Sequence, residues 1–264
     1  MSDEEASAYQ HQLQAVRREF GKQAPAWSTD QISPDLQAMV ARLPLRPHCQ
    51  VLDVAAGTGL LSRSMAPHVK SVAAVDLTPE MLARGRQAAA QAGIANVHFE
   101  QGAAEDLPYP AAAFDLIATR FSIHHFLSPA AALREMARVC RPGGQVAVID
   151  LVAPEDPHLA AGYNDWERRR DASHARALPL GELCQLMEEI GLKITLRDTR
   201  DVEMNVDDWL NFAQTEPGRR AHIRQALRQE LEGSTPTGLR PFRREGALLF
   251  LHRWGIVAGE KLQA

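Results

Sequence analysis

The chain has few cysteines and no long hydrophobic run, and each absence excludes a class of protein. Its three cysteines, Cys49, Cys140 and Cys184, are far apart and odd in number, which excludes a disulfide framework and a cysteine-based metal site. No apolar run reaches the ~18 residues that a membrane-spanning helix requires, and the first residues are acidic, whereas a secretory signal begins with basic residues. The sequence therefore predicts a soluble protein without a membrane span, and we expect it in the cytoplasm.

An excess of positive charge is also absent. The 29 Lys and Arg residues are outnumbered by 33 Asp and Glu residues, which gives a formal net charge of −4. Proteins that bind nucleic acid through a broad phosphate-binding surface have the opposite balance. We therefore expect no nucleic-acid partner, and the sequence leaves the oligomeric state open.

Strand and helix patterns alternate from residue 50 onward. The expected strands, all short and apolar, span 51–54, 72–75, 97–99, 114–119 and 146–151. Capping residues such as Thr78 and Gly93 mark the ends of the helices between them. This alternation predicts a parallel sheet. The later elements are less regular and are expected as a helix near 179–190 and strands at 192–196 and 247–251.

A loop of small residues, Ala55-Ala56-Gly57-Thr58-Gly59, follows the first expected strand. Small side chains let the backbone approach a ligand, and the next helix offers free N–H groups. The NAD fingerprint requires a third Gly or Ala where this chain has Ser62, and the carboxylate of Asp53 would repel a pyrophosphate but suit an ammonium group. Asp76, at the end of the second expected strand, can accept both hydroxyls of an adenosine ribose. The pattern favours an adenosyl ligand, with a plain turn and a solvated Asp as the alternatives.

The order of these motifs resembles class I S-adenosylmethionine (SAM)-dependent methyltransferases. The segments similar to that family's motifs are 51–59, 75–82, 104–109, 114–117 and 138–144. The best match is the type 11 domain, typified by the ubiquinone/menaquinone-biosynthesis C-methyltransferases. Segments 120–126 and 170–176 look like a bacterial subgroup of that domain, and 20–24, with Pro25 and Trp27, resembles a lid segment.

The resemblance implies a Rossmann-like α/β fold, with a mostly parallel sheet, an antiparallel last strand and helices on both faces. It implies SAM as the cofactor and methyl transfer to the O, N or acidic C of a small organic acceptor. We expect one domain, in which 1–47 form a helical lid, 48–151 the SAM-binding core and 152–264 the substrate-side helices and last strands. The alternatives are a SAM-binding protein without methyl transfer, an RNA methyltransferase and, more distantly, an NAD-dependent oxidoreductase.

The family's motifs also imply a set of cofactor-binding residues. These are Asp53, Ala55, Gly57, Gly59, Asp76, Leu77, Met81, Ala103, Ala104, Glu105 and Arg120. Two positions depart from the family's pattern. Ala55 stands where the first glycine of the loop is usual, and Ala103 where an Asp often binds the adenine amino group. We therefore expect backbone groups and apolar contacts to hold the adenine.

Three histidines are candidate general bases, because imidazole exchanges protons near neutral pH. His124 and His125 follow the fourth expected strand, at the edge of the sheet where ligands bind. A histidine that only satisfies backbone groups at a helix start is the equal alternative for each. His174 is the third candidate, and Tyr163 is a weaker one. A metal site built from His174 and Asp150 lacks ligand spacing, so we expect no metal.

Residues 168–176 carry four arginines around His174. A helix here would place Arg170 and His174 on one face, and the guanidinium would then keep His174 neutral. Arg170, Ser173 and Arg176 are the expected substrate-binding residues, since guanidinium groups recognise a carboxylate, enolate or phenolate. A solvated, self-paired helix face is the alternative.

Overall fold

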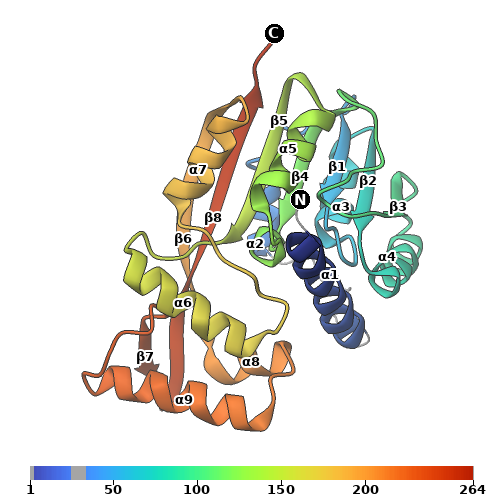
Figure 1. Ribbon diagram of the computed structural model, residues 1–264. Coiled ribbons are helices and arrows are strands. Elements are labelled where there is room, and N and C mark those ends of the chain that lie inside the picture. The colour runs from blue at the N-terminus through green and yellow to red at the C-terminus, as the bar shows by residue number, and fades with distance from the viewer. Residues whose placement is uncertain (1–2, 25–33, 264) are drawn as a thin grey trace.

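A sheet of eight strands forms the centre of the protein in the computed structural model, which describes residues 3–24 and 34–263 (Figure 1). The strands are β1 (Gln50–Val54), β2 (Ser71–Asp76), β3 (Val97–Gln101), β4 (Phe114–Arg120), β5 (Cys140–Leu151), β6 (Leu192–Asn205), β7 (Pro241–Arg244) and β8 (Ala247–Lys261). The helices are α1 (Asp3–Gln23), α2 (Pro34–Val40), α3 (Leu60–Met65), α4 (Pro79–Gln91), α5 (Pro129–Val139), α6 (Pro157–Arg170), α7 (Leu180–Glu189), α8 (Val206–Phe212) and α9 (Pro217–Leu231). Two short 3₁₀ helices are η2 (Ala66–His68) and η3 (Ile123–His125).

The strand order is β3-β2-β1-β4-β5-β8-β6, and β7 pairs with β8 outside this path. Strands β1 to β5 run parallel to one another. Strand β8 lies antiparallel between β5 and β6. This arrangement confirms the predicted Rossmann-like sheet, mostly parallel with an antiparallel last strand.

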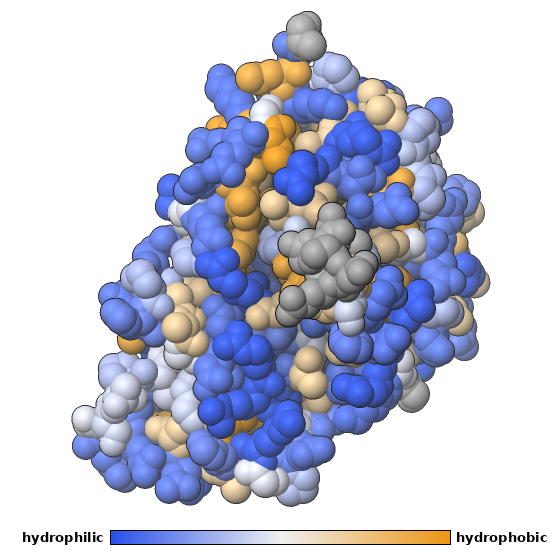
Figure 2. Space-filling model, in the orientation of Figure 1, coloured by the Kyte–Doolittle hydropathy of each residue, from blue (hydrophilic) through white to orange (hydrophobic). Residues whose placement is uncertain are grey.

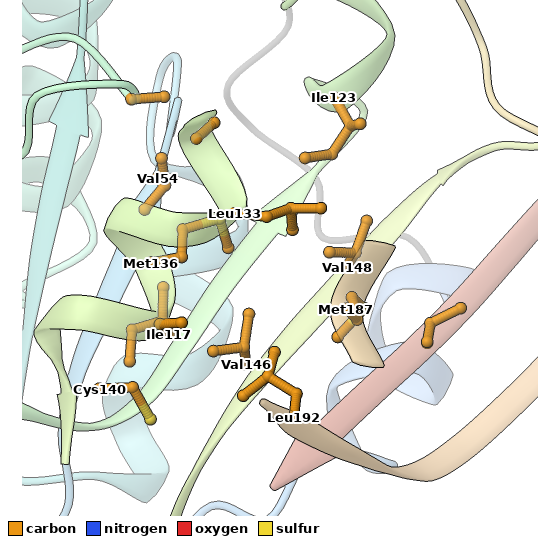
Figure 3. Close-up of a cluster of buried hydrophobic side chains, with 14 of the residues drawn as sticks. Val54, Ile117, Ile123, Leu133, Met136, Cys140, Val146, Val148, Met187 and Leu192 are labelled. Atoms are coloured by element: carbon orange, nitrogen blue, oxygen red, sulfur yellow. The ribbon is translucent and has the colours of Figure 1, made fainter. Parts of the chain in front are cut away.

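Helices cover both faces of this sheet. Successive side chains of a strand point to opposite faces, so Leu52 and Val51 of β1 belong to two different cores. Leu133 of α5 and Met187 of α7 pack in the first core with Ile117 of β4 (Figure 3). Helices α2, α3 and α4 contribute to the second core on the other face.

Strands β6 and β8 extend past the parallel strands into a second lobe, seen at the bottom of Figure 1. They contain 14 and 15 residues, so the strands predicted at 192–196 and 247–251 are too short. The extended part of β8 pairs with β7. Helices α6, α8 and α9 pack around it through a third core that contains Trp209, Phe250 and Leu227.

A helix through 168–176, which would place Arg170 and His174 on one face, does not form beyond Arg170. Helix α6 ends at Arg170, and the carboxylate of Asp171 accepts hydrogen bonds from the Ser173 N–H at 2.9 Å and the Ser173 hydroxyl at 2.6 Å. Such local bonds compete with helix formation. Arg170 and His174 therefore do not share a helix face.

The N-terminal segment divides into two parts. Helix α1 packs beside α4, whereas α2 is buried in the second core through Leu36, Met39 and Val40. Pro25 and Trp27, which belong to the lid resemblance, lie outside the described residues.

The face of the molecule in Figure 2 is mostly hydrophilic, with a hydrophobic stripe between α5 and α7. Leu186 of α7 and Ile190, the residue after that helix, are partly buried and pack against the first core. Across 3–24 and 34–263, no helix combines the length and apolar character needed to cross a bilayer.

Candidate active site

A cavity of about 600 Å³ lies at the carboxyl ends of the parallel strands, where open α/β sheets bind ligands. Its volume is typical of small-molecule sites. We call the part lined by the loops after β1, β2 and β3 the loop half. The part lined by Phe121, Trp209, Phe212 and Trp254 we call the aromatic half.

The loop after β1 turns through three left-handed residues, with φ of +54° at Ala55, +56° at Gly57 and +68° at Gly59. Ala55 and Gly57 line the cavity. Gly59 does not, because it packs against Phe99, whose ring would lie 2.6 Å from an added Cβ. Gly59 thus has a role in close packing, and its predicted contact with the cofactor stays a prediction.

Three carboxyl groups line the loop half. Asp53 accepts a hydrogen bond from the Ser62 hydroxyl at 2.5 Å, and burial raises the pKa of Asp53 to about 7. Asp76 accepts from the N–H of Gly57 at 2.7 Å and of Thr78 at 2.8 Å, and burial raises its pKa as well. The third carboxyl group is that of Glu105, whose pKa is also raised by burial.

This half of the cavity fits SAM. A buried carboxyl group with a raised pKa would be ionised by a cation placed beside it, and the amino group of SAM would be such a cation if it lay beside Asp53. Asp76 keeps lone pairs for ribose hydroxyls, because a carboxylate offers about four acceptor sites. The wall between them is formed by Leu77, Met81, Ala103 and Ala104.

Helix α1 forms the roof of the cavity through Tyr9, Gln12, Leu13, Val16, Phe20 and Gln23. The Gln12 amide donates hydrogen bonds of 2.8 Å to the carbonyls of both His125 and Ser173. The Tyr9 hydroxyl donates to Glu105 Oε2 at 3.2 Å, and burial together with this carboxylate raises the pKa of Tyr9 to about 12. No sequence motif singles out Tyr9 or Gln12 beyond their place on a helix.

His124 lines the cavity and pairs with a buried carboxylate. Its Nδ1 lies 2.5 Å from Oδ1 of Asp150, and Asp150 also accepts from the N–H groups of Ser122 and Leu151. The attraction of Asp150 outweighs burial and raises the pKa of His124, while it lowers the pKa of Asp150. Asp150 therefore fixes this ring through Nδ1 and leaves Nε2 for another partner.

His125 lines the cavity beside His124, with ring centroids 4.1 Å apart. Its Nδ1 donates to the Ser173 carbonyl at 3.0 Å, and burial lowers its pKa to about 4. His174 is buried behind these two rings, outside the cavity lining, with Nε2 2.7 Å from Asn164 Oδ1. Burial lowers the pKa of His174 to about 3.

The predicted substrate-binding residues are not brought together. Arg170 lines the cavity but lies between Glu167 at 3.2 Å and Asp171 at 3.5 Å. Ser173 is buried behind His125, and Arg176 is exposed and paired with Glu182 at 2.5 Å. The structure thus corrects the placement of Ser173 and Arg176, because neither lines the cavity.

Arg120 lines the cavity between the two halves, with its guanidinium 4.8 Å from the Phe121 ring centroid. Burial lowers its pKa, against the attraction of Asp53 and Asp150. Phe121 has a φ of +54° and meets Trp254 edge-on at 4.8 Å. A left-handed backbone is rare for a bulky residue and is concentrated at functional sites.

The sequence also gave no signal for His252, which is buried in the wall of the aromatic half. Tyr163 is buried rather than on a helix surface, and its hydroxyl lies 2.9 Å from His252 Nε2. No group of three His, Cys, Asp or Glu side chains in the described part of the chain is arranged to hold a metal.

Comparisons with known proteins agree with this geometry. Residues 52–148 match the methyltransferase domain family. The chain is 33% identical to the uncharacterized methyltransferase YcgJ of Bacillus subtilis over 77% of its own length and 82% of the relative. The crystal structure of YcgJ superposes with a TM-score of 0.80 at 29% identity, covering 87% of this chain and 98% of that one.

A second relative is the ubiquinone/menaquinone biosynthesis C-methyltransferase UbiE of Ectopseudomonas mendocina. It is 38% identical over 46% of this chain and 49% of its own length, so the chain spans only about half of that relative. The match to YcgJ covers most of both proteins, and the family match over 52–148 includes the loops after β1, β2 and β3. The chain therefore belongs to the class I SAM-dependent methyltransferases, and its cofactor is S-adenosylmethionine.

Proposed function

We propose that the protein methylates a small organic acceptor bound in the aromatic half of the cavity, with His124 as the general base. The observation that carries this proposal is the His124–Asp150 pair, whose ring lines the cavity 2.5 Å from a buried carboxylate. Bound SAM supplies a methyl group that is already activated for displacement. The chain's own residues then need only to bind, orient and accept a proton.

The cofactor residues are assigned within the loop half. Asp53 holds the amino group and Asp76 the ribose hydroxyls, while Leu77 and Met81 contact the adenine. Ala55, Gly57, Ala103, Ala104 and Glu105 complete the wall, and Arg120 lies at its boundary with the aromatic half. Helix α1 covers the cavity and excludes water, as closing lids do in other enzymes.

The base is assigned to His124 rather than to its neighbours. His125 has a pKa of about 4, which makes its ring a poor proton acceptor near neutral pH, and it serves instead as a polar wall. His174 does not line the cavity. In His124, the Nδ1–H bond to Asp150 directs the lone pair of Nε2 toward an acidic O–H, N–H or C–H of the acceptor.

The experiment is a screen of small hydroxylated, aminated and carbon-acid compounds in which S-adenosylhomocysteine release is measured. With an acceptor found, His124→Asn should lower kcat by roughly 10²-fold or more, while SAM affinity stays close to that of the wild type. The matched control is His98→Asn, at an exposed position of β3, which should retain full activity. Full turnover by His124→Asn would remove the base assignment.

A further inference from the structure

A second histidine–carboxylate pair faces the aromatic half of the cavity. His252, on β8, lines the cavity and is only 4% exposed. Its Nε2 lies 3.2 Å from Oε1 of Glu167 and 2.9 Å from the Tyr163 hydroxyl. Glu167 is fully buried, and a buried carboxylate is costly unless it is paired.

The partners of Glu167 determine which nitrogen of His252 carries the proton. An ionised carboxylate favours an N–H facing it, so Nε2 of His252 is the protonated nitrogen. Arg170, 3.2 Å from Oε2 of Glu167, already balances the charge of this carboxylate. With the ring proton on Nε2, the lone pair of the ring is on Nδ1. Among the described residues, Nδ1 has no hydrogen-bond partner.

The surroundings of Nδ1 indicate what it binds. Trp254, two positions along β8, lines the same cavity with Phe121 and Trp209. A ligand with an apolar skeleton fits these aromatic walls. The lone pair of Nδ1 lies among them and requires a hydrogen-bond donor from the ligand, because an unpaired buried polar group is costly. Arg170, held by Glu167 and Asp171, does not supply that donor to Nδ1, since its guanidinium is engaged by the two carboxylates.

We propose that His252 accepts a hydrogen bond from a second hydroxyl or amino group of the acceptor, distinct from the group that is methylated. The inference rests on the proposed function, because it takes the aromatic half as the acceptor site. His124 and His252 then form two hydrogen-bond acceptors, each held by a buried carboxylate, on the wall of one cavity. The acceptor is accordingly an apolar molecule with two protic groups, and His252 is a specificity-determining residue.

The test uses the full-length protein saturated with S-adenosylhomocysteine, so that binding is measured without methyl transfer. The probes are resorcinol, 3-methoxyphenol and 1,3-dimethoxybenzene, which share a shape and carry two, one and no hydroxyl groups. Their dissociation constants are measured by ligand-detected NMR. One neutral hydrogen bond predicts that resorcinol binds roughly threefold to tenfold more tightly than 3-methoxyphenol.

His252→Phe should abolish this preference and keep the preference of 3-methoxyphenol over 1,3-dimethoxybenzene. Glu167→Gln, which retains the size of the side chain, should reduce the first preference in the same way. The control His98→Phe should bind all three probes as the wild type does. Equal affinities in the wild type, no binding by any probe, or a preference that survives in His252→Phe would each overturn the proposal.

A second measurement determines directly which nitrogen of the His252 ring carries the proton. Nitrogen-15 NMR of the histidine rings should show His252 as the Nε2–H tautomer with an unprotonated Nδ1, and an Nδ1–H tautomer would overturn the proposal. A merely structural His252 would lower the melting temperature of His252→Phe without changing the ratio of probe affinities. Because none of these measurements involves methyl transfer, their outcome is independent of whether His124 is the base.

Discussion

Ala55 is strained at the point where the loop half of the cavity begins. A left-handed conformation costs a residue with a Cβ about 1–2 kcal/mol, and glycine avoids this cost but loses about 0.5–1 kcal/mol through the entropy of the unfolded chain. Ala55→Gly should therefore raise the free energy of unfolding by up to about 1 kcal/mol, measured by urea denaturation. Ala112, with a φ of +56° on an exposed loop, is the matched control, and Ala112→Gly should give a similar gain. A loss of stability in Ala55→Gly alone would show that its methyl group has a packing role.

Asp76 tests the orientation of the cofactor. Its replacement by Ala removes the two hydrogen bonds assigned to the ribose, each with a net contribution of roughly 1.5–3 kcal/mol. Calorimetry should accordingly show SAM affinity lowered by roughly a hundredfold or more. Glu100→Ala, which removes an exposed carboxylate bonded to Tyr109, should bind SAM normally. An unchanged affinity of Asp76→Ala would contradict the ribose assignment.

Residues within local motifs could be predicted from the sequence, whereas partners distant in the chain could not. Asp53 and Asp76 follow strands in a recognisable order, and both line the cavity. The sequence offers Asp150 only as a possible metal ligand, because no local pattern shows that it meets His124 at the ends of two neighbouring strands. Arg176 shows the opposite error, because it is expected at the substrate and lies at the surface instead. There it pairs with Glu182, and no local pattern predicts that pair.

Among the elements, α1 lies over the cavity, and few side-chain hydrogen bonds join it to the cavity wall. We propose that it opens and closes as a lid, with the two hydrogen bonds of Gln12 as its latch. Gln12→Ala should speed SAM dissociation in stopped-flow measurements by several-fold, because two hydrogen bonds of about 1 kcal/mol each are lost. Gln14→Ala, at an exposed position on the same helix, is the control. Equal dissociation rates in the two variants would mean that α1 is fixed packing.

The lengths of β6 and β8 show where sequence patterns fail for whole elements. The parallel strands are buried on both faces, so their short apolar runs are conspicuous. The later part of β6 carries charged residues such as Asp201 and Glu203, which appear typical of a loop. They lie in a strand because β6 pairs with β8 along its length, and in that register Arg240 and Arg253 bind Asp201 while Arg244 binds Glu203. Those pairs depend on strand register, which the sequence does not give.

At the scale of the whole molecule, the cavity exists only where three parts of the chain meet. The parallel strands supply the loop half, α1 supplies the roof, and β8 with α8 supplies much of the aromatic half. The family's motifs cover the first of these. The acceptor site is formed mainly by the parts without motifs, which is why the sequence predicted the cofactor but not the acceptor.

The buried histidines also make the stability of the whole molecule depend on pH. His125 and His174 have pKa values of about 4 and about 3 in the folded protein, below the usual value of about 6.5 in an unfolded chain. The unfolded state therefore binds more protons below pH 6.5, so the stabilisation is present above pH 6.5 and is lost as the pH falls toward 4. His124, with a raised pKa, is protonated in both states below pH 6.5 and adds no slope there.

Each of the two histidines should contribute a slope of about 1.4 kcal/mol per pH unit. Urea denaturation should then show the free energy of unfolding falling by a few kcal/mol between pH 6.5 and pH 5. His125→Phe should lose about half of this slope, whatever its stability at pH 7, because the replaced ring no longer takes up a proton on unfolding. Leu133→Ala, which removes only packing from the first core, should lower stability equally at every pH. If the pH slope of the free energy of unfolding were unchanged in His125→Phe, the His125 ring would be protonated in the folded protein. It could then not be the neutral polar group beside His124 that is assigned above.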